Sequence, residues 1–250
     1  MNKRGQVTIF IILAIIILAG IIAFFILRNN SNETDIFSSS GQTSSINKFI
    51  ESCFEEIISE AFLLISFQGG YYNVPEPKKQ LGPLLIPYYL YEGKFNVPQI
   101  EEIEGQISSY IEENSERCLN NISGNYELKN KGEPNTNSKF EENELKVKVN
   151  FPLIFTKENE GIKIDEFKIE KQTKFLEHYN NMLEFLEEQQ QNKNELPIGS
   201  LNALALSNGY IYSIFDEDDE ILFAFHFIEP DETILTYNFF IKYNWGENEK

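Results

Sequence analysis

The sequence feature that most constrains this chain is an uncharged, apolar run of twenty-one residues, residues 7–27. Lys3 and Arg4 precede the run, and Arg28 follows it. At about 1.5 Å of rise per residue, a helix of this length would reach roughly 30 Å, the thickness of a bilayer's hydrocarbon core. The run is longer than the apolar part of a cleaved secretory signal and does not end in small residues. We therefore predict a membrane anchor that stays in the mature chain.

The charges around the run predict its orientation. Two basic side chains and the terminal amine precede it, whereas a single Arg follows it and the next basic residue is Lys48. Because Lys and Arg are retained on the cytoplasmic side, the N-terminus is predicted to be cytoplasmic. The predicted location is the cell membrane, with a single span through the lipid bilayer at residues 7–27 and an extracytoplasmic C-terminal domain.

The four residues before the run carry a second signal. Lys3, Arg4, Gly5 and Gln6, followed directly by the apolar run, resemble the N-terminus of archaeal type IV pilin-like proteins with a class III signal peptide. The resemblance covers about the first 27 residues and implies cleavage between Gly5 and Gln6 by a prepilin-type peptidase. Phe10 occupies the fifth mature position, where such proteins commonly carry Glu. The alternative is that the two basic residues only orient the span.

Composition excludes one class of partner. The chain has 21 basic and 39 acidic residues, a formal net charge of −18, and all of the acidic residues follow Arg28. Because nucleic-acid binding depends on neutralising phosphates with Lys and Arg, we predict no nucleic-acid partner. The acidity is explained either by solvation of the surface or by cation binding.

The two cysteines, Cys53 and Cys118, both lie in the predicted extracytoplasmic part. An oxidising compartment favours a disulfide between them. The alternatives are two free core thiols or a metal site, although no other Cys or His has the close spacing of a zinc site.

Apolar spacing of three and four residues predicts a helix from Ser44 or Ser45 to the Gly69-Gly70 pair. A second helix is predicted over residues 98–119. If the two helices pack antiparallel, Cys53 and Cys118 fall at the same end of the pair. Between the helices lies a segment rich in Tyr, Pro and Gly, which we expect to be an ordered loop with short strands. Its tyrosines either cover the helices or line a carbohydrate- or peptide-binding face.

The second half of the chain switches to alternating apolar residues after a polar segment, residues 129–143, that we interpret as a loop or boundary. The expected elements are a hairpin at 145–151 and 162–169, a helix at 174–191, and strands at 210–215, 221–227 and 233–243. Antiparallel pairing would place these strands in one sheet of four to six members.

The predicted fold class is therefore α+β, with an N-terminal transmembrane helix, a helical pair, and one antiparallel sheet with one packed helix. The predicted divisions are the anchor at 1–28, a flexible linker at 29–45, the helical pair with its aromatic loop at 46–128, and the sheet subdomain at 129–250.

Few residues indicate chemistry. The acidic run at 216–220 is a calcium candidate but lacks the spacing of an EF-hand, and it is also explained as a solvated turn. His178 is expected to be solvated on its helix, and His226 to be packed or to face the sheet. No phosphate-binding, dinucleotide-binding, serine-hydrolase or zinc-protease motif is present. We assign no catalytic residue, cofactor or metal ligand.

These observations predict a membrane-anchored cell-surface protein whose outward-facing domain is structural or binds cell-surface proteins or polymers, without catalytic activity. One alternative is a processed pilin-like filament subunit, and another is a membrane-anchored hydrolase.

Overall fold

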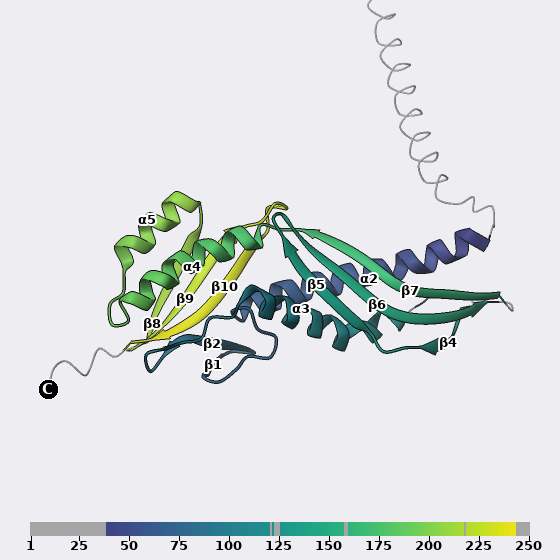
Figure 1. Ribbon diagram of the computed structural model, residues 1–250, viewed down its shortest axis with the longest axis horizontal. Coiled ribbons are helices and arrows are strands. Elements are labelled where there is room, and N and C mark those ends of the chain that lie inside the picture. The colour runs from purple at the N-terminus through teal and green to yellow at the C-terminus, as the bar shows by residue number, and fades with distance from the viewer. Residues whose placement is uncertain (1–38, 121, 123–125, 158–159, 218, 244–250) are drawn as a thin grey trace, which may run out of the picture. The chain divides into compact units, whose positions relative to one another are not determined.

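The computed structural model describes residues 39–243 except 121, 123–125, 158–159 and 218 (Figure 1). The chain divides into two compact units, Met1–Ser45 and Ile46–Lys250. The helices of the described part are α2 (Ser39–Phe67), α3 (Ile100–Asn114), the 3₁₀ helix η1 (Ser115–Leu119), α4 (Phe175–Gln191) and α5 (Ile198–Asn208). Its strands are β1 (Lys78–Leu81), β2 (Leu84–Tyr91), β3 (Lys94–Phe95), β4 (Glu127–Lys131), β5 (Asn135–Glu141), β6 (Glu144–Lys157), β7 (Glu160–Gln172), β8 (Ile211–Glu217), β9 (Glu220–Ile228) and β10 (Ile234–Lys242).

The described residues form an α+β fold, but the predicted arrangement is wrong. None of the helices in the described part of the chain combines the length and the apolar character needed to cross a membrane. The segment for which the membrane span was predicted, residues 7–27, lies outside that part. The strands form two sheets rather than one, and one of these sheets contains a parallel pair.

The larger sheet has six strands in the order β1-β2-β10-β9-β8, with β3 paired to β2. The three C-terminal strands were predicted, and they pair antiparallel in consecutive order. The Tyr-rich segment between α2 and α3 contributes β2, which lies parallel to β10. Aromatic residues fit a strand buried on both faces. The short strands expected in this segment are therefore present, and β2 is a member of the larger sheet.

The smaller sheet is built on the long strand β6. The predicted hairpin is correct: β6 pairs antiparallel with β7 along most of its length. The other side of β6 pairs with β5 near its start and with β4 near its end. Residues 129–143, predicted as a loop, therefore form most of two strands. In β5, Thr136, Ser138 and Phe140 are buried and alternate with exposed residues, but their mixed polarity hides the strand pattern.

Helix α3 lies along the free edge of β5 and supplies hydrogen-bond acceptors to it. The backbone N–H groups of Thr136, Ser138 and Phe140 bond to the side chains of Glu112, Ser108 and Glu104 at 2.6, 3.0 and 2.7 Å. Four helical residues rise about 6.0 Å, and two strand residues rise about 6.8 Å. Because these repeats nearly match, every second N–H on the edge finds an acceptor one helical turn further along.

Helix α2 packs its apolar face into the core between strands of both sheets. The predicted face is correct: Ile50, Phe54 and Ile57 are almost completely buried. The ring centroid of Phe54 lies 5.1 Å from that of Phe167 on β7. The helix begins at Ser39, within the segment predicted as a linker. Once a helix is nucleated, further turns are added at little cost, so the modest helix propensity of Ser does not stop it.

The C-terminal end of α2 is held by side chains from the six-stranded sheet. Gly69 and Gly70 have φ angles of 59° and 83°, and the Gly70 N–H bonds to the Ile65 carbonyl at 2.8 Å, as in a Schellman ending. The Asn238 amide donates to the Phe67 carbonyl at 2.9 Å, and the Tyr89 hydroxyl donates to the Gly69 carbonyl at 2.8 Å. Carbonyl groups that a helix end leaves unpaired are thus satisfied by β10 and β2.

One aromatic residue connects the two sheets. The ring of Phe175, at the start of α4, lies 4.5 Å from Phe140 on β5, 5.6 Å from Phe62 on α2 and 6.1 Å from Tyr237 on β10. The predicted helix α4 then packs on β9, where Phe185 contacts Phe223. Helix α5 was not predicted. Its sequence has no charged residue, and Pro197 at its N-cap and Gly199 in its first turn suggest a break in the chain.

Replacing Gly70 with Ala should destabilise the fold strongly. A Cβ at this position would lie 2.6 Å from the Tyr237 hydroxyl, and the φ of 83° strains any L side chain. We expect Gly70→Ala to lower the free energy of unfolding by about 2 to 4 kcal/mol in chemical denaturation. The matched control is Gly105→Ala on α3, where the new Cβ meets nothing within 4 Å. That change should stabilise by up to about 1 kcal/mol, and equal effects at both sites would contradict this account.

Candidate functional site

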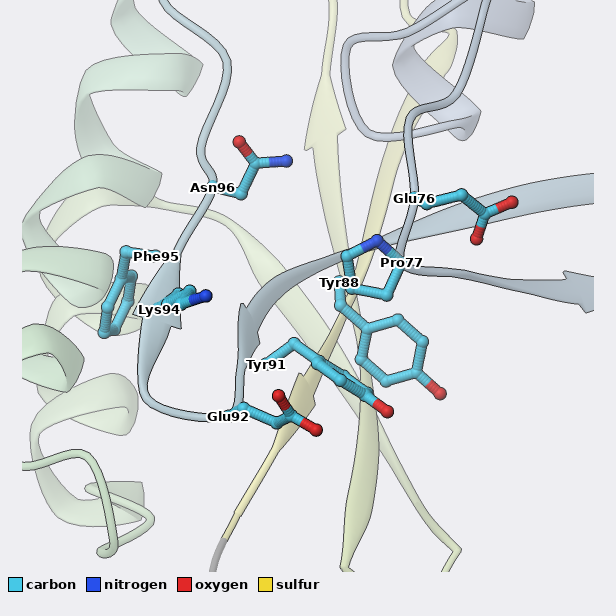
Figure 2. Close-up of a pocket in the computed structure, with 8 residues that line it drawn as sticks. All are labelled: Glu76, Pro77, Tyr88, Tyr91, Glu92, Lys94, Phe95 and Asn96. Carbon is cyan, nitrogen blue, oxygen red and sulfur yellow. The ribbon is translucent and has the colours of Figure 1, made fainter.

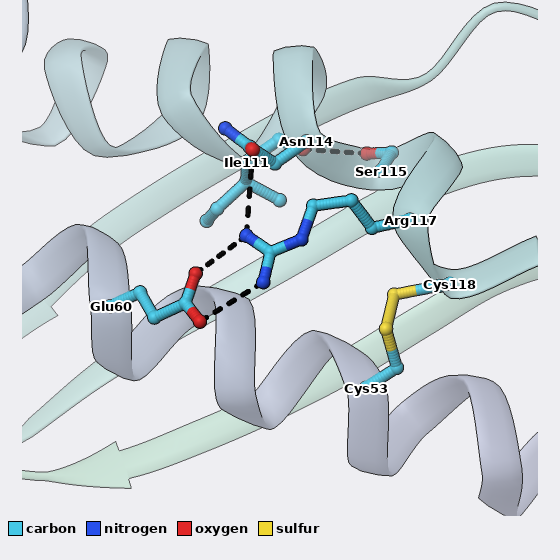
Figure 3. The surroundings of a disulfide bond; sticks show 7 residues. All are labelled: Cys53, Glu60, Ile111, Asn114, Ser115, Arg117 and Cys118. Atoms are coloured by element: carbon cyan, nitrogen blue, oxygen red, sulfur yellow. Dashed lines mark hydrogen bonds and ion pairs between the residues drawn. A yellow bond between two sulfur atoms is a disulfide. The ribbon is translucent and has the colours of Figure 1, made fainter. Parts of the chain in front are cut away.

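The predicted disulfide is present. Cys53 on α2 and Cys118 in η1 are bonded, with their Cα atoms 5.5 Å apart (Figure 3). Beside it, Arg117 donates two hydrogen bonds to the Glu60 carboxylate, at 2.6 and 3.0 Å. This ion pair is about half exposed, so water screens it and it adds little stability. The covalent bond is therefore the main connection at this end of α2 and η1.

Removing the disulfide should lower the stability measurably. The bond closes a loop with a sequence separation of 65 residues, which corresponds to about 4 kcal/mol in the chain-entropy model. We expect the paired change Cys53→Ala and Cys118→Ala to lower the free energy of unfolding by about 2 to 4 kcal/mol. Arg117→Ala, next to the bond, is the control and should cost less than about 1 kcal/mol. A double variant as stable as the parent would refute a stabilising role.

The predicted processing site near the N-terminus lies outside the described residues. Gly5 and Gln6, the proposed cleavage pair, belong to that part of the chain, as does the apolar run at 7–27. Their roles in processing and in membrane contact remain predictions.

The prediction for His178 was wrong, because the side chain is buried and not solvated. It is 8% exposed, its ring stacks on Phe227 with centroids 4.5 Å apart, and Nε2 lies 3.3 Å from Oε1 of Glu229. Glu229 is also buried, at 6% exposure. The histidine thus lies beside a buried carboxylate within the core, although the geometry between Nε2 and Oε1 does not make a hydrogen bond.

His226 faces the sheet, as predicted, and has hydroxyl partners on both neighbouring strands. Its Nε2 lies 3.2 Å from the Ser213 hydroxyl on β8, and its Nδ1 lies 3.1 Å from the Thr236 hydroxyl on β10. A hydroxyl beside an imidazole resembles a nucleophile and its base, but hydrolysis also requires oxyanion donors and a concave substrate site. In this structure the imidazole and the two hydroxyl groups satisfy one another's hydrogen-bonding atoms across three strands.

Both His226 and its partners belong to one face of the six-stranded sheet, which we call the outer face. The opposite face of β8, β9 and β10 packs on α4 (Figure 1). On the outer face the strand register brings the following residues together: Ile211, Ser213 and Phe215 on β8; Glu220, Leu222, Ala224, His226 and Ile228 on β9; Ile234, Thr236, Asn238, Phe240 and Lys242 on β10. The face therefore mixes seven apolar residues with six polar ones: Ser213, His226, Thr236 and Asn238 lie along its middle, and Glu220 and Lys242 lie at the end next to the β8–β9 turn.

Part of the outer face is covered by the β1–β2 hairpin. Ile86 and Tyr88 of β2 form a separate buried cluster with Leu222 and Phe240. The ammonium of Lys79 on β1 lies 5.1 Å from the centroid of the Phe240 ring. This hairpin closes the end of the face nearest the β8–β9 turn.

The polar contacts between the β1–β2 hairpin and the outer face converge on Glu220. Its carboxylate accepts hydrogen bonds from Lys79 at 2.9 Å, Tyr88 at 2.8 Å and Lys242 at 3.1 Å. Burial opposes ionisation, but these three donors outweigh it and lower the pKa of Glu220 to about 2. Glu220 belongs to the acidic run considered for calcium, and in this structure its oxygens bond to protein donors. Among the described residues, no group of three or more His, Cys, Asp or Glu side chains is placed to hold a metal ion.

The Glu220 contacts should stabilise the protein in a pH-dependent way. The folded-state pKa of about 2 lies below that of an unfolded Glu, about 4.3, so the contribution is complete above about pH 5 and is lost as the pH falls toward 2. We expect Glu220→Gln to lower the free energy of unfolding at pH 7, with the difference from the parent shrinking between pH 5 and pH 2. Tyr88→Phe should give a smaller loss. A difference that does not change with pH would contradict the assignment.

A hollow of about 550 Å³ lies beside the hairpin, lined by Glu76, Pro77, Tyr88, Tyr91, Glu92, Lys94, Phe95 and Asn96 (Figure 2). Tyr88 and Tyr91 contact each other edge to face. Glu92 has a φ of 49°, an unusual value for a residue with a side chain. Of the predicted Tyr-rich segment, therefore, some tyrosines cover the core, as Tyr71 and Tyr89 do, and others line this hollow.

Beyond the hairpin, Ala224 and Asn238 on the outer face are buried, but several apolar residues are open to solvent. Ile211, Phe215, Ile228 and Ile234 are 67%, 55%, 61% and 64% exposed, and Ile228 lies directly opposite Ile234 in the register. We call these four residues, together with His226, the open patch. Because His226 is already hydrogen-bonded on both sides, its polar atoms do not prevent an apolar partner from covering the patch. Ile211, Ile228 and Ile234 lie near one another at one end of the face, and Phe215 lies further along β8. Exposed apolar residues that lie close together mark interaction surfaces.

Comparisons of the chain with protein-family models, with curated proteins and with solved structures found no match.

Sequence reasoning located the strands of this surface but missed the surface itself. The β-branched and aromatic residues of β8 and the continuous apolar run in β9 indicate strands, and the run in β9 indicates burial on both faces. Which end of the outer face stays open depends on where the β1–β2 hairpin packs, and the sequence does not indicate this. Likewise Lys79 and Lys242 lie far from Glu220 along the chain, so no local pattern connects them.

Proposed function

We propose that this protein is a cell-surface interaction protein, attached to the lipid bilayer through residues 7–27, whose extracytoplasmic domain binds a partner protein through the open patch. No catalytic activity is part of this proposal. Its location rests on the apolar run and its flanking charges. The Cys53–Cys118 disulfide supports that location, because such bonds persist in oxidising compartments and are rare in the cytosol.

The observation that carries the interaction role is the exposure of the open patch. Its four aliphatic and aromatic side chains are each more than half exposed, on a sheet whose other face is packed on α4. Leaving such residues in water costs roughly 1.5 to 3 kcal/mol for each, relative to burial. A partner that covers them recovers this free energy. The surrounding polar groups of the patch are internally bonded, so covering them leaves no unpaired donor or acceptor.

Photocrosslinking in intact cells tests this proposal. A photoreactive phenylalanine analogue at position 228 or 234 should give crosslinked adducts with another protein. The same analogue at position 163 is the control, because Lys163 is exposed on β7 of the other sheet. We expect adducts from both patch positions and few from the control position. Absence of adducts at the patch, or equal yields at all three positions, would refute binding through the patch.

A membrane-impermeant biotin ester, applied to the same cells, tests the location separately. Labelling of the extracytoplasmic lysines before lysis is expected. Labelling only after lysis would contradict the predicted orientation, whatever the crosslinking result.

A further inference from the structure

The two sheets have strand edges that differ in how they are protected. The strand order leaves β8 and β1 at the edges of the larger sheet, and β5, β4 and β7 at the edges of the smaller one. An edge strand presents unpaired N–H and C=O groups that can pair with a strand from another chain. Proteins prevent this with charged edge residues, short strands, bulges, Pro or a covering element.

All of these edges except β8 carry such protection. Helix α3 supplies acceptors to three successive outward N–H groups of β5. The edge of β7 is charged, with Lys163, Asp165 and Lys168 exposed and in ion pairs. Strand β4 is short and exposed along its whole length, with charges at Glu127, Lys129 and Lys131. Strand β1 has only four residues and includes two lysines.

Strand β8 lacks these protections over residues 211–215, because its charged residues, Asp216 and Glu217, both lie at its end next to the β8–β9 turn. Its seven residues, IYSIFDE, contain no Lys, Arg or Pro, and its register with β9 continues without a bulge. Its β-branched and aromatic residues favour an extended backbone. In the described part of the chain, no strand pairs with its outer side. Ile211 and Phe215, two members of the open patch, project from this strand and are more than half exposed.

We propose that β8 is a strand-addition site, at which an extended segment of a basic partner protein pairs with the edge of the six-stranded sheet. This inference rests on the proposed function and specifies how the partner binds. The main chain of the partner would supply the hydrogen bonds, and its alternate apolar side chains would cover Ile211 and Phe215. Asp216 lies exposed at the end of the same strand and next to an acidic turn, so a Lys or Arg at the matching end of the partner is favoured.

Charge determines the choice of occupant. A second copy of this chain would bring two molecules of formal net charge −18 together, with an acidic turn at the end of each β8. The mutual repulsion disfavours that pairing at moderate salt. A basic segment of another protein is instead attracted by the negative charge of this chain.

The test uses the full chain in detergent micelles and a labelled synthetic heptapeptide with Val at alternate positions and Lys at both ends. Fluorescence anisotropy should show saturable binding below about 1 mM, weaker at high salt. A second peptide carries N-methyl groups on the amides of one edge, which removes its main-chain donors and leaves its side chains. We expect it to bind at least about tenfold more weakly. A third peptide, with Glu in place of Lys at both ends, should bind at least as weakly as the N-methylated peptide.

Two protein variants supply matched controls. Phe215→Lys places on β8 the kind of charge that protects β7 and should weaken binding of the basic peptide by about tenfold. Leu206→Lys makes the same chemical change at an exposed position on α5 and should change binding by less than about twofold. Equal melting temperatures of the two variants would verify that Phe215→Lys is folded, and the N-methylated peptide tests the parent protein without any substitution.

Several results would overturn strand addition: no binding of the basic peptide, equal binding of the N-methylated peptide, or equal effects of the two variants. Sedimentation that shows a parent dimer and a Phe215→Lys monomer would also overturn it, because the occupant would then be a second copy. If the patch still crosslinks to a partner in cells, the proposed function survives these results. If the peptide binds but positions 228 and 234 give no crosslinks in cells, the proposed function is refuted and strand addition at β8 stands.

Discussion

Burial of one face of α2 is the interaction on which the rest of the structure depends. Phe54 packs on β7 of the smaller sheet, and Phe62 contacts Phe140 of the same sheet and Phe175 of α4. At the end of the helix, Asn238 of the larger sheet binds an α2 carbonyl. Each sheet would otherwise expose an apolar face to water. The helix provides both with a common packing surface, so neither sheet's core can form fully without it.

The same helix end explains how the outer face is shaped. The Gly69-Gly70 turn brings the following segment back across the larger sheet, where β2 pairs with β10 and the β1–β2 hairpin covers Phe240. Coverage stops there because the hairpin is short. The ends of β9 and β10 farther from the Glu220 cluster stay exposed as a result, as do Ile211 and Phe215 on the edge strand β8. His226 satisfies its own polar atoms within the sheet. The open apolar surface thus follows from the length of one hairpin, whereas the free edge of β8 follows from the strand order.

The elements predicted correctly are those whose signal is local and strong. Helix α4 and the β6–β7 hairpin have clear periodicity, and the cysteine pairing followed from the positions of Cys53 and Cys118 in two helices. The missed elements have weak or misleading local signals. Strand β5 looks like a polar loop because α3, more than twenty residues earlier, satisfies its outward N–H groups. Helix α5 has Pro197 at its N-cap and Gly199 in its first turn, and tertiary packing of Leu201 and Ala205 holds it in place.

The sequence by itself determined the type of the strongly periodic segments, which face of α2 is apolar, and that two cysteines could meet at one end of a helix pair. These properties depend on the periodicity and spacing of residues within single elements. Only the tertiary structure decided that the strands divide into two sheets, that Lys79, Tyr88 and Lys242 converge on Glu220, and which part of the outer face stays open. The physical reason is that strand pairing and side-chain convergence join residues far apart in the chain, and many pairings satisfy the same local pattern until the whole core is packed.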